Sequence, residues 1–440
     1  MLLNKTFQRI VKFQVSGGIL LMIAALTAII IANSPLSGLY QSLWEHHISF
    51  QIGDFNLFSH GGHAITIKEF INDALMAVFF FAVGLEIKRE IMVGELSTIK
   101  KAMLPVVAAC GGMIVPVLIF FFMTQGTPAE KGLAVPMATD IAFALGVLTL
   151  FGKRVPLSLK IFLTAFAVVD DIGGILVIAL FYTSHIETSY LIYSAVLLLA
   201  LTLSNIGGIK NRWVYAIGCV AMWYMFMQSG IHATIAGVVV AFTVPAKPRA
   251  KIGSYVQSLH ESISTIPACK SDRIILNHEQ IEALHNIKSA TDDAISPLQF
   301  LEEFLHRPVN FFIMPLFAFA NAGVMLTNSE GNMEIGLLTW AVTFGLLFGK
   351  FIGIYLFTWI IVKVGLTSMG EGMNWKNLTG ICLLGGIGFT VSLFIANLSF
   401  ADNEILLNQA KMGVLLGTLL SGVIGYLVLY KTLPKPIKSL

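Results

Sequence analysis

Two adjacent carboxylates lie near the middle of a long apolar stretch. Asp170 and Asp171 interrupt an apolar run from about 161 to 182, which is long enough to cross a lipid bilayer, since a crossing takes about 20 residues. A carboxylate at that depth costs about 2.5 kcal/mol or more to insert, and acids that persist there are functional by default. Two neighbouring carboxylates also resist ionising together. The pair therefore predicts a site that binds a cation, a proton, or each in turn.

A lysine stands inside another apolar stretch. Lys350 lies near the middle of a predicted span over 335–362, whereas a lysine near either end could extend its ammonium group to the membrane surface. A lone ammonium group in hydrocarbon is unfavourable. We therefore expect Lys350 to pair with one of the buried aspartates.

Two further apolar stretches contain residues that interrupt helices. In the stretch 132–151, Pro136 is followed by Thr139 and Asp140, and in the stretch 378–400 glycines and a threonine gather at 385–390. Proline removes a helical hydrogen bond and moves the preceding residue away from helical geometry. Irregular backbone in a membrane is tolerated only where protein buries it or where it lines a cavity. Two such spans in different halves of the chain predict a transporter site at an inverted repeat.

The composition predicts that these stretches belong to an all-α polytopic membrane protein. The 440 residues are 56% hydrophobic and 12% charged, against about 25% charged in soluble domains. The net charge of +3, without an extended basic stripe, gives no indication of nucleic-acid binding. We expect one transmembrane domain over 1–440 and about twelve spans, of which the fourth and eleventh are interrupted. The spans are predicted near 14–33, 70–87, 102–124, 132–151, 161–182, 190–206, 213–227, 231–245, 308–326, 335–362, 378–400 and 408–430.

The distribution of basic residues predicts the orientation of these spans. With the N-terminus in the cytoplasm, 24 of the 28 lysines and arginines fall in cytoplasmic segments. This is the asymmetry that the positive-inside rule requires. We therefore place both termini in the cytoplasm, an outer loop at 34–69, and a long cytoplasmic loop at 246–307.

Both loops carry patterns of their own. In the outer loop, apolar residues alternate from Ile48 to Leu57 around Gly53-Asp54, which predicts a short β-hairpin. An isolated hairpin is marginal in water, so a partner subunit that covers it, in a homodimer, is one candidate. The cytoplasmic loop has helical apolar spacing near 281–287 and 298–305, which predicts two amphipathic helices and no separate catalytic domain.

The sequence resembles the NhaA family of sodium/proton antiporters in stretches that together cover nearly the whole chain. These are Val15-Ser16-Gly17-Gly18, the run from Asn72 to Phe80, the run from Ala138 to Ala144, Val169-Asp170-Asp171, His232-Ala233-Thr234, the run from Pro315 to Gly323, and the run from Gly386 to Thr390.

The resemblance implies roles for the residues already singled out. By this resemblance, Asp170 and Asp171 are the transport carboxylates, and Lys350 pairs with Asp170. Thr139 and Asp140 lie at the crossing of the broken helices. Sodium prefers oxygen ligands, and Asp171, Asp170 and Thr139 can supply them. Asp140 and Lys350 are suited to offset the charges at the helix ends that meet there. Positions linked by the resemblance to a pH response are Glu86, Arg89, Glu90, His232, Glu302 and His306.

Two regions that contain pH-response positions also have plainer interpretations. The charged end of the second span, which includes Glu86 and Arg89, is either a solvated helix terminus or the rim of a cytoplasmic entrance. His232 is either a packed or capping residue or a group that titrates near neutral pH.

The function implied by the resemblance is electrogenic, pH-regulated exchange of Na⁺ or Li⁺ for H⁺ across a bacterial inner membrane. The stoichiometry implied is two protons for each sodium ion, and the role is sodium and pH homeostasis. We expect no enzyme activity, no cofactor, and no partners beyond lipid, the transported ions and a second copy of the chain. Two alternatives stay open: a sodium-coupled symporter of organic solutes, and an intramembrane aspartyl protease. The protease needs acids on two facing helices, whereas this pair is adjacent on one helix.

Overall fold

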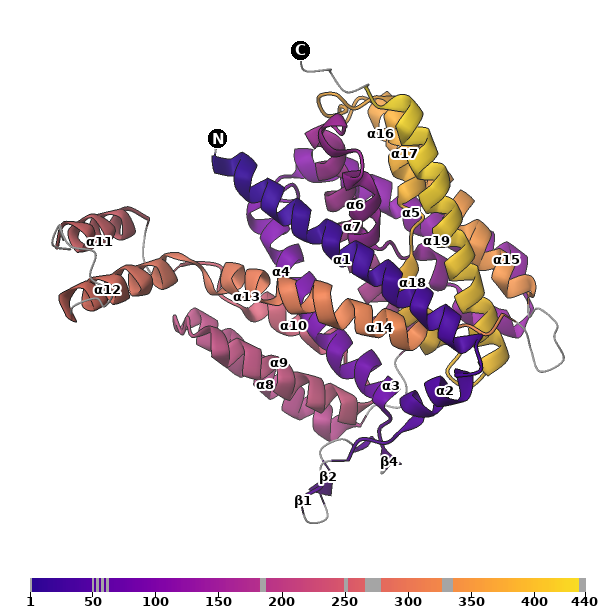
Figure 1. The fold of residues 1–440 in the computed structure, drawn as a ribbon, viewed down its shortest axis with the longest axis horizontal. Coiled ribbons are helices and arrows are strands. Elements are labelled where there is room, and N and C mark those ends of the chain that lie inside the picture. The colour runs from indigo at the N-terminus through magenta and orange to yellow at the C-terminus, as the bar shows by residue number, and fades with distance from the viewer. Residues whose placement is uncertain are drawn as a thin grey trace.

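The computed structural model describes residues 2–49, 51–52, 55–56, 59–60, 63–182, 187–248, 252–265, 278–326 and 335–434, and nearly all of them are helical (Figure 1). The helices are α1 (Leu2–Ala32), α2 (Ser37–Glu45), α3 (Ile67–Phe70), α4 (Met76–Val93), α5 (Ile99–Thr124), α6 (Ile141–Thr149), α7 (Leu157–Phe181), α8 (Thr188–Ile206), α9 (Arg212–Ser229), α10 (Ile235–Thr243), α11 (Ile252–Thr265), α12 (His278–Ala294), α13 (Pro297–Pro308), α14 (Met314–Asn321), α15 (Leu337–Phe344), α16 (Lys350–Lys363), α17 (Trp375–Leu384), α18 (Phe389–Ser399) and α19 (Glu404–Thr432).

Several neighbouring helices are parts of one longer helix. Five-residue π-helical turns join α3 to α4 (η1, Ile71–Leu75), α13 to α14 (η5, Val309–Ile313) and α15 to α16 (η6, Gly345–Gly349). A π turn adds one residue to a helical turn and often marks a functional position. The third of these turns ends directly before Lys350, and so sets the direction in which that side chain leaves the helix.

Six helices of the described chain are long and apolar enough to cross a membrane, and up to nine spans result if each bent pair counts as one. The chain is therefore an all-α, multi-pass membrane protein, as predicted. The predicted count of twelve stays a prediction. The predicted span over 231–245 shows why: its helix, α10, has only nine residues and extends about 14 Å. The bilayer core is about 30 Å thick.

Both spans predicted to be interrupted are bent. A 3₁₀ segment at Pro128–Met137 meets α6 at 45°, with a break at 138–140. Helices α17 and α18 meet at 41°, with a break at 385–388. The inverted repeat that these breaks suggested stays a prediction.

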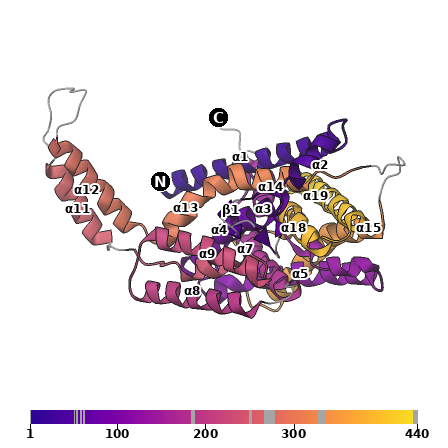
Figure 2. The same cartoon turned by 90° about the horizontal axis from the view of Figure 1, so that it is seen from below.

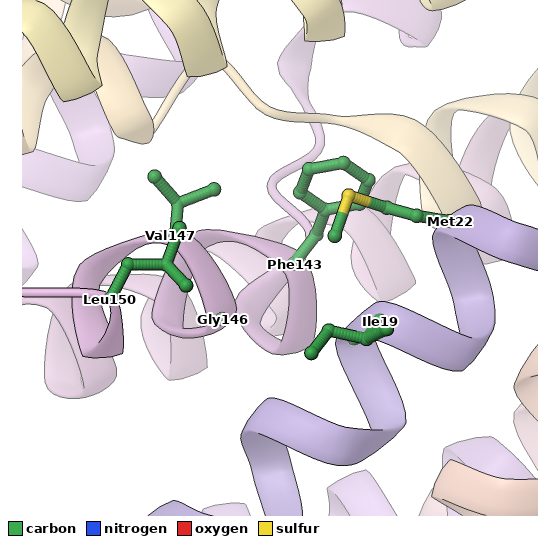
Figure 3. Close-up of a pocket in the computed structure, with 7 residues that line it drawn as sticks. Ile19, Met22, Phe143, Gly146, Val147 and Leu150 are labelled. Carbon is green, nitrogen blue, oxygen red and sulfur yellow. The ribbon is translucent and has the colours of Figure 1, made fainter.

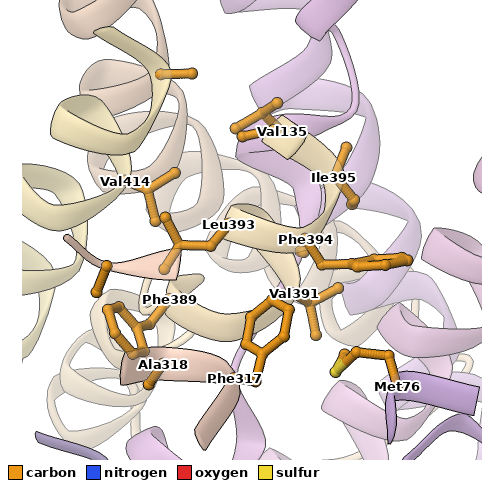
Figure 4. Close-up of a cluster of buried hydrophobic side chains, with 14 of the residues drawn as sticks. Met76, Val135, Phe317, Ala318, Phe389, Val391, Leu393, Phe394, Ile395 and Val414 are labelled. Carbon is orange, nitrogen blue, oxygen red and sulfur yellow. The ribbon is translucent and has the colours of Figure 1, made fainter. Parts of the chain in front are cut away.

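The core lies between the elements that carry these breaks. A cluster of side chains nearly inaccessible to solvent forms it, among them Phe317 of α14, Phe389 and Phe394 of α18, Met76 of α4 and Val135 (Figure 4).

On the outside of the bundle, large apolar side chains are exposed; examples are Leu26 at 59%, Phe122 at 74% and Leu180 at 76%. Lipid is the solvent that such surfaces require.

Glycines allow some helices to approach closely. A Cβ atom at Gly237 of α10 would lie 2.2 Å from the carbonyl oxygen of Ala77, and one at Gly84 would lie 2.7 Å from the Cβ of Ala241. Small residues at such positions are the usual means by which membrane helices pack. Helices α4 and α10 are therefore in backbone contact.

The outer loop contains two small hairpins. Strand β1 (Gln51–Ile52) pairs with β2 (Phe55–Asn56), at the position where a hairpin is expected, and β3 (Ser59–His60) pairs with β4 (His63–Ala64). The loop is closed at its base, because the amide of Ile48 donates to the carbonyl of Ile65 at 2.8 Å. Gly53 and Asp54 of the expected turn lie outside the described residues.

The described parts of the segment 246–307 contain three helices, one more than predicted. Helices α12 and α13 coincide with the two predicted helices, and Pro297 is the first residue of α13, after the capping residue Ser296. The third helix, α11, pairs with α12 in an arm that extends away from the bundle in both views (Figures 1 and 2). The apolar spacing that revealed the other two was not recognised in α11.

Candidate functional site

The two broken spans touch at their breaks. The hydroxyl of Thr139 donates to the carbonyl oxygen of Gly385 at 2.8 Å, and the amide of Asp140 donates to that of Ile387 at 2.6 Å. Ser392 donates to the carbonyl oxygen of Val135 at 2.7 Å. Backbone groups that neither helix can satisfy alone are thus satisfied by the other, as membrane burial requires.

Asp140 caps two helices at once. Its Oδ1 accepts from the amide of Phe143 in α6 at 3.0 Å, and its Oδ2 accepts from the amide and hydroxyl of Thr390 in α18, at 3.1 and 2.7 Å. Helix N-termini carry a partial positive charge. One carboxylate therefore offsets two of them, which is the role expected for Asp140 from the sequence.

Lys350 pairs with Asp170. Its Nζ lies 2.8 Å from Oδ1 and 2.6 Å from Oδ2 of Asp170, and both side chains are completely buried. The Nζ also lies 5.6 Å from the centre of the Phe166 ring. Lys350 and Asp170 thus form a buried ion pair, while the role of Lys350 in offsetting charge at the helix ends stays a prediction. Thr139 satisfies a carbonyl at the end of α17.

Asp171 has no such partner. It lies on α7 next to Asp170 and is 7% exposed, yet it makes no hydrogen bond or ion pair within the described part of the chain. Asp170 is committed to Lys350 and the hydroxyl of Thr139 to Gly385, so two of the three expected sodium ligands already have partners. Asp171 therefore holds the available carboxylate of the site.

The surroundings of the site contain neither a cluster of metal ligands nor a polar cavity among the described residues. Among the described residues no group of three or more His, Cys, Asp and Glu side chains could hold a metal ion. A small cavity between α1 and α6, about 30 Å³ in volume, is lined by apolar side chains such as Ile19, Met22 and Leu150 (Figure 3). It could admit about one water molecule and offers no ligand. The unpaired carboxylate is the group that a proton or Na⁺ can occupy.

Four of the expected pH-response residues form one cluster. Arg89 of α4 lies 2.8 Å from Glu90, 2.8 Å from Glu302 of α13, and 4.0 Å from Glu86. Burial raises the pKa of Glu302, while the neighbouring Arg89 guanidinium opposes that rise. The cluster joins three acids to one base, so deprotonation leaves excess negative charge between α4 and α13.

Lys88 is a contributor that sequence reasoning did not single out. Its Nζ donates to the carbonyl oxygens of Phe242 and Val244, at 2.7 and 2.5 Å, at the C-terminal end of α10. A cation at this end of a helix is favourable. Only its place beside Arg89 could have drawn attention to it, because its acceptors are backbone atoms far away in the sequence.

The two histidines among the expected pH-response residues, His232 and His306, lie outside the Arg89 cluster. His306 contacts Asn310 at 3.0 Å in the continuous helix of α13 and η5, and burial lowers its pKa. His232 lies beside Tyr182, with ring centres 6.5 Å apart, and its Nε2 is buried without a hydrogen-bond partner. The structure does not bring these six residues to a single place.

Comparison with known proteins finds similar sequences over nearly the whole chain. The model of the family described as Na⁺/H⁺ antiporter 1 matches residues 8–429. The chain is 63% identical to the Na⁺/H⁺ antiporter NhaA of Phocaeicola vulgatus, over 98% of this chain and 97% of that protein. It is 57% identical to the NhaA of Bacteroides fragilis, over 96% and 97%. The solved sodium proton antiporter MjNhaP1 of Methanocaldococcus jannaschii aligns with a TM-score of 0.48 and 14% identity, over 99% of this chain and 100% of that one.

Replacing Lys350 with alanine should destabilise the protein. Removal of one partner of a buried ion pair leaves the other charge uncompensated, which costs about 3–5 kcal/mol. Lys363→Ala on the same helix is the matched control, because its exposed ammonium group only lies 4.4 Å from the Trp359 ring, an interaction of about 0.5–1 kcal/mol. Thermal melts in detergent should show a large fall for the first variant and a small one for the second. Equal melting temperatures would contradict the pairing.

Proposed function

The chain belongs to the Na⁺/H⁺ antiporter 1 family, and from this premise we propose that it exports Na⁺ or Li⁺ in exchange for protons across the inner membrane of a bacterium. This proposal rests on a difference between the two adjacent carboxylates: one has an ion-pair partner and the other does not, among the described residues. Asp170 is neutralised by Lys350, whereas Asp171 is buried without a partner among the described residues. A buried, unpaired carboxylate is unstable unless it binds a proton or a cation.

Competition at Asp171 gives the exchange its mechanism. A proton and a sodium ion cannot occupy the same carboxylate oxygens together, so the site holds one or the other. If the site faces the two sides of the membrane in turn, loading by a proton on one side and by sodium on the other produces antiport. The touching breaks beside it, at Thr139 and Gly385, supply the place where rigid half-helices can shift.

The pair of Asp170 and Lys350 supplies the second proton. Sodium that binds at Asp171 also draws the neighbouring carboxylate of Asp170 away from Lys350 and breaks the ion pair, and burial then favours release of the lysine's proton, because a low-dielectric surrounding disfavours the charged ammonium form. With one proton at Asp171 and one at Lys350, two protons enter for each sodium ion that leaves. The cycle moves one net charge, worth about 2.3 kcal/mol at 100 mV. The inward-negative potential thus drives sodium out.

We also propose that the Arg89 cluster makes this transport depend on pH. The folded protein holds the proton of Glu302 more tightly than the unfolded chain does, because burial raises its pKa. Its stabilising contribution is therefore full below the ordinary glutamate range and is lost as the pH rises through the raised pKa. Alkaline pH loosens the contact of α13 with α4 and frees the end of the span that carries Glu86.

The proposed orientation has both termini and the arm of α11 and α12 in the cytoplasm, and the β-hairpins outside. In that orientation the hairpins extend from the outer face and are too small to be stable alone. We propose that they pair two copies of the chain into a homodimer.

Asp171→Asn should abolish sodium-driven proton movement in vesicles, since an amide keeps the shape but cannot ionise. The measurement is proton flux in proteoliposomes after addition of Na⁺ or Li⁺. Asp402→Asn, an acid-to-amide change in the exposed connection between α18 and α19, is the matched control and should transport normally. Near-normal exchange by the Asp171 variant would refute the site.

Arg89→Ala should shift the pH profile of transport toward alkaline pH. Without the guanidinium, nothing opposes the rise in the pKa of Glu302, so deprotonation needs a higher pH, by about one unit. Arg154→Ala is the control, because Arg154 donates to the backbone carbonyl oxygens of Tyr430, Leu433 and Pro434. Activity measured between pH 6 and 9 should shift for the first variant alone. A shift toward acid pH would show that the sign of the coupling is wrong.

Replacing residues 50–63 with two glycines should convert the dimer to a monomer while transport persists. The change continues the pairing of Ile48 with Ile65 and closes it with a two-residue turn, so the rest of the loop keeps its bonds. Light scattering of the purified protein gives the mass, and proton flux gives the activity. A dimer of unchanged stability would exclude the hairpins as the interface.

A further inference from the structure

One hydroxyl group joins three elements of the transport site at the end of the molecule that carries the β-hairpins. Tyr182 directly follows α7, the helix of Asp170 and Asp171. Its Oη donates to the carbonyl oxygen of Lys131 at 3.0 Å and accepts from the hydroxyl of Ser399 at 2.8 Å. Lys131 belongs to the 3₁₀ segment that leads into one break, and Ser399 ends α18, which leads out of the other.

The same elements are in close contact beside this hydroxyl. A Cβ atom at Gly132 would lie 2.7 Å from the ring of Phe400, the residue after Ser399. The ring therefore packs directly on the backbone of the 3₁₀ segment. The outer ends of the two broken spans are thus held to each other by packing and to α7 by Tyr182.

The bond between Ser399 and Tyr182 can open at low cost. Ser399 Oγ also lies 2.8 Å from the carbonyl oxygen of Ile395, one turn earlier in its own helix. Its single hydrogen can move to that acceptor when Tyr182 withdraws, so no buried donor is left unsatisfied. If parts of the protein must break and remake this contact as they move, the hydroxyl needs a second acceptor. A buried hydroxyl without a hydrogen-bond partner would cost about 1–3 kcal/mol.

We propose that Tyr182 is a positioning residue for transport, a clamp that holds the outer ends of both broken spans against α7 and whose opening accompanies exposure of the site to the outside. The inference rests on the proposed function, because only a site that changes sides needs such a clamp. Tyr182 does not touch the ion. It sets how often the outward-facing arrangement forms, and leaves the affinity of the carboxylates unchanged.

The first test measures how readily the outer ends separate. In a chain whose four cysteines are replaced by alanine, Ala129→Cys places a thiol on the 3₁₀ segment, at a position only 5% exposed. A membrane-impermeant thiol reagent added outside should modify this cysteine about two- to ten-fold faster with Tyr182→Phe, the range allowed by one hydrogen bond. Tyr215→Phe is the matched control, because Tyr215 donates a similar bond, 2.9 Å, to the carbonyl oxygen of Ile209 in a distant part of the chain. It should leave the rate unchanged.

The second test separates positioning from a merely structural role. Tyr182→Phe and Ser399→Ala should each change the maximal rate of sodium-driven proton flux by about two- to ten-fold, with the apparent KM for sodium kept within two-fold. The double variant should match Tyr182→Phe, because that change already removes the contact between Tyr182 and Ser399. Melting temperatures should stay close to that of the parent chain.

The outcomes separate this inference from the proposed function. If the parent chain shows no sodium-driven proton flux, the proposed function fails. If the parent transports but Tyr182→Phe behaves as Tyr215→Phe in both tests, the clamp is refuted. Additive effects of the two single variants, or a change in KM with an unchanged maximal rate, would also overturn it.

Discussion

The interior of a membrane offers no water, so each polar group there must find a partner in the protein. Nearly the whole arrangement around the broken spans follows from this constraint. The free amides of α6 and α18 converge on Asp140, the free carbonyl oxygen at the end of α17 accepts from Thr139, and Lys350 and Asp170 neutralise each other. Once these demands are met, Asp171 is the carboxylate of the pair that makes no ion pair or hydrogen bond among the described residues. In the proposed exchange, this carboxylate is the group that binds the proton or the sodium ion.

The scaffold keeps this balance while allowing movement. Long helices such as α5, α7 and α19 supply a rigid frame, whereas the half-helices meet through a few hydrogen bonds at their breaks. The breaks therefore concentrate the possible motion at the depth of the carboxylates. At the other end of α4, Lys88 and Arg89 connect the same bundle to α10 and α13, where the arm of α11 and α12 leaves and rejoins it.

Sequence reasoning found the parts of the site whose signals are local. Proline, glycine and buried charges stand out in apolar stretches, so both interruptions, the acid pair and the buried lysine could be predicted. The resemblance supplied the choice of Asp170 over Asp171 as the partner of Lys350, which intramembrane cost alone left open. It also supplied Glu302, whose contact with Arg89 spans more than two hundred residues.

Other features depend on three-dimensional contacts that no local pattern reveals. The apolar residues from 231 to 245 predict a full span, whereas the helix within them, α10, has only nine residues. Thr139 was expected at the crossing of the broken helices and as an ion ligand, but its hydrogen bond to Gly385 depends on where the second break lies. The bonds of Tyr182 are of the same kind, since one of its partners is a backbone oxygen and the other lies 217 residues away.

In the proposed cycle, the pair of Asp170 and Lys350 carries one proton while Asp171 exchanges the other for sodium. Sodium-driven proton flux in proteoliposomes of the parent chain and of Lys350→Ala, measured with and without an imposed membrane potential, distinguishes these two roles. The parent's rate should depend on the potential. The variant should still exchange the ions, but with a rate that the potential no longer changes. Full voltage dependence in the Lys350 variant would show that Lys350 carries no proton.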